Sequence, residues 1–135
     1  KVDENSGSFG RHFVEQAARS AHSTWLGPLP HHEALALMSQ TKVVINPSWA
    51  EVQSLVELEA AAAGCFVVTT ESGSAREYLG GCARIHPEGS AMTDLARSAL
   101  NIIESSPQPP VFEYAHTWDS SARAIVALAT SGAQR

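Results

Sequence analysis

The sequence predicts an α/β fold in which a parallel sheet of about four strands lies between two layers of helices. Short apolar segments alternate along the chain with helical ones, an order that indicates right-handed crossovers between parallel strands. Residues 43–45 are wholly apolar and β-branched, as in a strand that helices cover on both faces. Hydrophobic residues make up 44% of the chain but aromatic ones only 7%, which favours closely packed helices over an all-β sandwich.

The helices are predicted from apolar residues that recur at the helical period. In residues 91–105, for example, Leu95, Ala99, Leu100 and Ile103 form one apolar stripe. The helix before Gly64 is expected to end there, because glycine is typical of the position that follows a helix. The full set of predicted helices covers residues 11–22, 31–40, 54–63, 74–79, 91–105 and 119–129.

The strands are predicted where short apolar segments, rich in β-branched residues, lie between turn residues. They cover residues 24–26, 43–45, 66–70 and 83–85, and the last is expected to be a weak edge strand. A chain of 135 residues has room for one domain, so residues 1–135 are expected to form a single one. Within it, residues 107–135 would supply a proline-containing link and a closing helix.

Composition excludes several classes of function. The net charge of −5 lacks the basic surface expected of a nucleic-acid-binding protein. No apolar run reaches the roughly 18–20 residues that a transmembrane segment needs, and no signal peptide is visible. Two cysteines are too few for a disulfide framework, so a cytoplasmic location is expected. The sequence contains no G-x-G-x-x-G or Walker A motif, and the adjacent His31 and His32 do not make a metal site, so neither a cofactor nor a metal is expected.

Ligands of open parallel α/β sheets bind at the carboxyl ends of the strands, where this sequence places three loops. The loop at residues 46–54 carries the strongest signal, because Glu51 and Glu59 stand there with seven residues between them. A carboxylate on a mostly apolar helix face is costly unless it meets polar partners, and sugar or ribose hydroxyls are such partners. The spacing leaves an alternative open, in which Glu51 caps the helix and Glu59 is solvated.

The helix that follows this loop is expected to open with the amides of Ser54, Leu55 and Val56. Amides at a helix start hold a phosphate with help from the helix dipole. Glu57 serves as a control for the two other glutamates. It is expected to point away from the pocket, either on the surface or in a structural pair.

Several segments together resemble the retaining glycosyltransferases of family 4. The signature of that family, two glutamates separated by seven residues, is similar to Glu51 and Glu59 with Pro47-Ser48 before them and Ala60-Ala61-Ala62-x-Gly64 after them. The other segments that resemble the family are Trp25-Leu26-Gly27-x-Leu29, Leu35 to Thr41, Gly73-Ser74-x-Arg76-Glu77-Tyr78-x-Gly80 and His116-Thr117-Trp118. The resemblance covers about residues 20–130.

The resemblance implies a Rossmann-like, three-layer α/β/α domain that forms the C-terminal, donor-binding half of a GT-B fold. It implies transfer of a sugar, with retention, from a nucleotide-diphosphate sugar to an acceptor; the nucleotide sugar is a substrate, and no cofactor is implied. Glu51 would be catalytic, in contact with the donor sugar or its phosphate side, and Glu59 would bind the ribose hydroxyls. The other donor-binding residues implied are Ser48, Ser54, Leu55, Val56, Gly27 and Pro30.

The sequence departs from the family at two places. Ser54 stands where the family usually has glycine, and the family's Gly-Arg…Lys-Gly segment, which clamps the pyrophosphate, has no counterpart. The N-terminal acceptor domain is also absent, so the chain alone is expected to be inactive. The alternative is a non-catalytic Rossmann-like interaction or scaffold domain that has lost donor binding. Expected partners are the missing domain, another protein that covers an exposed sheet edge, or a second copy of the chain in a homodimer.

Overall fold

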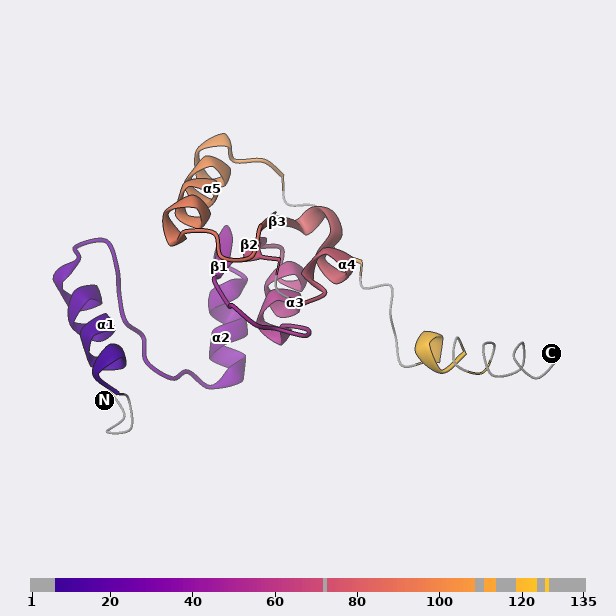
Figure 1. Cartoon of the computed structure of the whole chain (residues 1–135), viewed down its shortest axis with the longest axis horizontal. Coiled ribbons are helices and arrows are strands. Elements are labelled where there is room, and N and C mark those ends of the chain that lie inside the picture. The colour runs from indigo at the N-terminus through magenta and orange to yellow at the C-terminus, as the bar shows by residue number, and fades with distance from the viewer. Residues whose placement is uncertain (1–6, 72, 109–110, 114–118, 124–125, 127–135) are drawn as a thin grey trace. The chain divides into compact units, whose positions relative to one another are not determined.

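The structure is a computed structural model that describes residues 7–71, 73–108, 111–113, 119–123 and 126 (Figure 1). The chain divides into two units, Lys1–Ala34 and Leu35–Arg135. The first unit contains α1 (Ser8–Arg19), on which Phe13 packs edge-to-face against Trp25 with ring centroids 5.8 Å apart. Helix α2 (His31–Met38) spans the boundary between the units. The prediction of one domain over the whole chain stays a prediction.

The second unit is built on a parallel sheet of three strands, not of about four as predicted. The strands β1 (Val43–Asn46), β2 (Phe66–Thr70) and β3 (Ala83–His86) lie in the order β1-β2-β3. Val44 pairs with Val67 across the first ladder, and Val68 pairs with Arg84 across the second. The predicted edge position of β3 is confirmed, since among the described residues β3 pairs only with β2.

The fourth strand had been expected at residues 24–26, and that prediction was wrong. These residues form no strand, because a strand exists only where a partner pairs with it. Trp25 instead packs on Phe13 of α1 within the first unit. A three-residue apolar run is too short for periodicity alone to distinguish a strand from a loop.

Helices cover both faces of the sheet, which confirms the predicted three-layer α/β/α, Rossmann-like arrangement. Val67 of β2 packs in a core with residues of α3 (Leu55–Ala62) and α4 (Ala75–Leu79). The next residue, Val68, points to the opposite face and packs on α5 (Met92–Ser105). Neighbouring residues of a strand face opposite sides of a sheet, so this alternation places α3 and α4 in one layer and α5 in the other (Figure 1).

The bounds of the helices α1 to α5 agree with the predicted ranges to within about three residues. In α5, however, Leu95, Ala99 and Ile102 are the buried residues, whereas Leu100 and Ile103 of the predicted stripe are exposed. A 3-10 turn, η1 (Gly80–Cys82), leads into β3. Of the predicted closing helix, residues 119–123 are helical, and the His116-Thr117-Trp118 segment before it lies outside the described residues. None of the described helices is long and apolar enough to cross a membrane.

Candidate functional site

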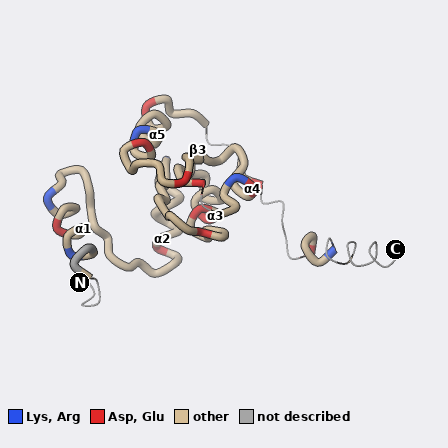
Figure 2. The backbone as a smooth tube through the Cα atoms, viewed as in Figure 1, with Lys and Arg blue, Asp and Glu red and all other residues tan. Residues whose placement is uncertain are grey.

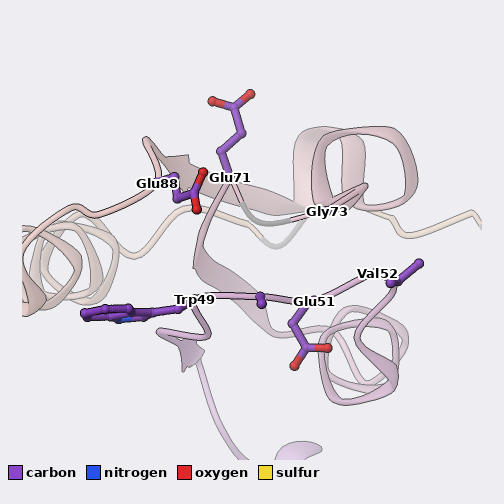
Figure 3. Close-up of a pocket in the computed structure, with 7 residues that line it drawn as sticks. Trp49, Glu51, Val52, Glu71, Gly73 and Glu88 are labelled. Carbon is purple, nitrogen blue, oxygen red and sulfur yellow. The ribbon is translucent and has the colours of Figure 1, made fainter.

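A pocket of about 360 Å³ opens at the carboxyl edge of the sheet, beyond the ends of β1 and β2. Its lining comes from the segments that follow all three strands: Trp49, Ala50, Glu51, Val52, Glu71, Gly73 and Glu88. Figure 3 shows Trp49, Glu51 and Val52 along one wall, with Glu71 and Glu88 on the other. The position agrees with the rule that parallel α/β sheets bind ligands at this edge.

The pocket wall is acidic. Glu51, Glu71 and Glu88 all contribute to it, and red segments lie around α3 and β3 in Figure 2. The nearby guanidinium of Arg76 is paired with Glu71, with Nη2 2.9 Å and Nε 3.0 Å from Oε1. No cluster of three or more metal-ligating side chains occurs among the described residues.

Hydrogen bonds hold the segment that carries Glu51 both before and after that residue. Thr70 Oγ1, at the end of β2, donates to the carbonyl of Ser48 at 2.5 Å, and the amide of Ser74 donates to the carbonyl of Val52 at 3.2 Å. Gly73 has φ +72° and lies so close that a Cβ on it would be 1.8 Å from the Glu51 carbonyl oxygen. Only glycine fits this approach of the two backbones.

The two glutamates of the motif have different surroundings. Glu51 is half-buried, lines the pocket and accepts a hydrogen bond from Ser48 Oγ at 3.1 Å. Glu59 is half-buried on α3 and does not line this pocket. Gly27, with φ +70°, and Pro30 belong to the first unit. The roles predicted for these residues remain predictions.

Ser54 is the N-cap residue of α3, as its position in the sequence suggests, but its hydroxyl makes no capping hydrogen bond. It is buried, and its Oγ accepts instead from Asn46 Nδ2 at 3.3 Å. Its backbone N–H donates to the hydroxyl of Tyr78 at 3.2 Å. That amide is therefore engaged within the protein, whereas Leu55 and Val56 open the helix with exposed side chains.

The sequence did not reveal which side chains surround Glu57. The surface position considered for it is wrong, because only 1% of Glu57 is exposed; the structural role considered for it fits. Its carboxylate accepts from Asn46 Nδ2 at 2.8 Å, Thr69 Oγ1 at 2.5 Å and the Tyr78 hydroxyl at 2.5 Å. A signal for these partners was present in the sequence, because Asn46 and Thr69 lie near the ends of two apolar strands. Polar side chains are costly to bury there unless a partner such as Glu57 bonds them.

Burial shifts several pKa values in this unit. Desolvation, followed by the hydrogen bond to Glu57, raises the pKa of Tyr78 to about 12, so its hydroxyl keeps its proton at neutral pH. Desolvation also raises the pKa of Cys65 and of Cys82. Both cysteines are free and buried. A buried, protonated thiol is a poor nucleophile, so neither cysteine is suited to catalysis.

The chain was compared with family models, with curated proteins and with solved structures. The model of the protein family described as "Glycosyl transferases group 1" matches residues 6–105, which include the sheet, α3 and every residue that lines the pocket. No curated protein and no solved structure gave a match to the chain.

Proposed function

Because the chain belongs to the group 1 glycosyl transferases, we propose that it is the donor-binding part of a retaining glycosyltransferase that uses a nucleotide-diphosphate sugar. The family match carries this proposal together with one observation. Glu51 is one of the residues that line a pocket at the carboxyl edge of a parallel sheet, close before the start of α3. In this proposal the nucleotide sugar is a substrate, and no cofactor is invoked.

We assign the donor contacts residue by residue. Glu51, with Ser48 beside it, faces the sugar or its phosphate side, and Glu59 binds the ribose hydroxyls. The start of α3, at Ser54, Leu55 and Val56, holds the distal phosphate. With the Ser54 amide donating to Tyr78, the amides of Leu55 and Val56 are the principal donors. Gly27 and Pro30 are kept as the residues that flank the base.

The electrostatics of the pocket support the proposal that the chain does not turn over alone. Transfer develops negative charge on the leaving diphosphate, and catalysis depends on donors or cations aimed at that charge. Neither lysine nor arginine is among the pocket-lining residues, and Arg76 beside them is paired with Glu71. We therefore propose that a second domain or a partner supplies the missing cations and the acceptor site. The partner could be a second copy of this chain.

Calorimetric titration of the chain with UDP and with GDP tests donor binding. We expect millimolar or tighter affinity for one of them, weakened about tenfold or more by Glu59→Ala, because a carboxylate–hydroxyl pair is lost. Glu104→Ala is the matched control, since it removes the same charge from an exposed position on α5. Unchanged binding by Glu59→Ala would contradict the ribose assignment.

The alternative is an interaction domain without donor binding. The acidic pocket wall favours it, because negative charge repels an anionic ligand. Absence of binding to either nucleotide supports this alternative. An assay of donor hydrolysis or sugar transfer by the isolated chain completes the test, and turnover that depends on Glu51 would refute inactivity.

A further inference from the structure

Four polar side chains form a connected cluster that includes residues on both sides of the loop that carries Glu51 in the sequence. We call it the polar floor: Asn46 of β1, Glu57 of α3, Thr69 of β2 and Tyr78 of α4. Glu57, Thr69 and Tyr78 are buried and Asn46 is partly buried. Asn46 and Thr69 are direct partners in the ladder between β1 and β2, which brings their side chains to one place.

Glu57 is the acceptor at the centre of the polar floor. Its Oε1 receives the Asn46 amide and the Thr69 hydroxyl, and its Oε2 receives the Tyr78 hydroxyl. A buried carboxylate is strongly destabilising unless such donors surround it. No buried side-chain polar atom of the described residues lacks a partner, so the polar floor is fully satisfied.

The polar floor reaches the start of α3 through Ser54. The Tyr78 hydroxyl donates to Glu57 and accepts from the Ser54 amide, so one oxygen joins the carboxylate to the backbone of the helix start. The Asn46 amide donates to the Ser54 hydroxyl as well as to Glu57. The amide and the hydroxyl of Ser54 are thereby both bound by the polar floor, and the side chain is buried.

We propose that Tyr78, held by Glu57, is a positioning residue that fixes the start of α3 for binding a nucleoside diphosphate. The inference rests on the proposed function and adds a residue to it. A helix start that is already ordered loses less conformational freedom when a phosphate binds, so preorganisation raises the affinity. It also explains how serine replaces glycine at position 54, because the polar floor draws the Ser54 side chain away from the phosphate approach.

A matched pair of variants separates positioning from general stabilisation. Tyr78→Phe and Thr69→Val each remove one hydroxyl that donates to Glu57, but only Tyr78 contacts the Ser54 amide. The readout is the ratio of the affinity for UDP to that for uridine, or of GDP to guanosine, measured by calorimetry. This ratio measures how much the two phosphates add to the affinity. General destabilisation of the fold weakens the binding of nucleotide and nucleoside alike, so it leaves the ratio unchanged.

We expect Tyr78→Phe to lower the ratio roughly fivefold, as the loss of one net hydrogen bond does, and Thr69→Val to leave it unchanged. Amide hydrogen exchange gives a second measurement without ligand. Exchange at Ser54, Leu55 and Val56 should accelerate in Tyr78→Phe and not in Thr69→Val. In the wild-type chain, added diphosphate should protect the Leu55 and Val56 amides more than the Ser54 amide, which Tyr78 already holds.

The outcomes distinguish this inference from the proposed function. If the wild-type chain binds neither nucleotide, the proposed function fails and the positioning role fails with it. If the wild type binds but Tyr78→Phe keeps the ratio, or Thr69→Val lowers it equally, only the positioning role is overturned. If Tyr78→Phe does not fold, the wild-type chain provides the test. Strong protection of its Ser54 amide from hydrogen exchange by the diphosphate would then overturn the positioning role of Tyr78.

Discussion

The residues that line the pocket, here called its rim, lie a few residues from the polar floor in sequence but differ from it in exposure and in hydrogen bonding. On the rim, Trp49 and Val52 are 85% and 84% exposed, whereas in the polar floor Thr69 is fully buried. The rim offers surface to a ligand, while the polar floor has its hydrogen bonds complete. The difference suggests that ligand contacts depend on the rim and that the geometry of those contacts depends on the polar floor.

The two glutamates Glu51 and Glu57 show the same contrast within one segment. Glu51 is half-buried at the pocket and accepts from Ser48 in its own loop. Glu57 is buried and accepts from three side chains on three other elements. Identical side chains six positions apart therefore have different environments, and measurements on variants should separate them.

The largest expected effect comes from removing the acceptor of the polar floor. Glu57→Ala leaves three donors near the core without their partner, so we expect a loss of about 3 kcal/mol or more in the free energy of unfolding. Glu51→Ala, the matched rim variant, should change it by about 0.5 kcal/mol or less. Urea unfolding measures both, and similar values for the two variants would refute the contrast between rim and polar floor.

A smaller effect on the free energy of unfolding is expected where the loop that carries Glu51 meets the loop that carries Gly73. Gly73→Ala places a Cβ against the Glu51 carbonyl and strains a backbone with φ +72°, so we expect a loss of about 2–3 kcal/mol. Gly81→Ala is the control, because no heavy atom lies within 4 Å of a Cβ built there. Thermal and urea unfolding of both variants provide the test, and equal stability would show that the two loops separate readily.

The smallest expected effect concerns the ion pair beside the pocket. Arg76 and Glu71 have side chains 66% and 48% exposed, so water screens their attraction. Arg76→Ala should therefore change the free energy of unfolding by about 0.5 kcal/mol or less, with the difference vanishing at high salt. A loss as large as that of Gly73→Ala would show that the rim is as tightly constrained as the polar floor.

The sequence predicted the framework of the site better than its interior. The two strands Val43–Asn46 and Phe66–Thr70 and the helix between them were expected from apolar runs and from Gly64, which has φ +86°. Their order was enough to place Glu51 at the carboxyl edge of a parallel sheet. Partners that depend on loop geometry were not predictable, as with Arg76, whose partner Glu71 lies across a turn.

By itself, the sequence determined the alternation of strands and helices, the resemblance to a glycosyltransferase family and the segment that bears Glu51 and Glu59, because these depend on patterns local to the chain. Only the tertiary structure decided that residues 24–26 form no strand and that Glu57 is buried. The physical reason is that hydrogen-bond partners are set by spatial proximity. Asn46, Thr69 and Tyr78 reach Glu57 only after β1 pairs with β2 and α4 packs beneath the loop.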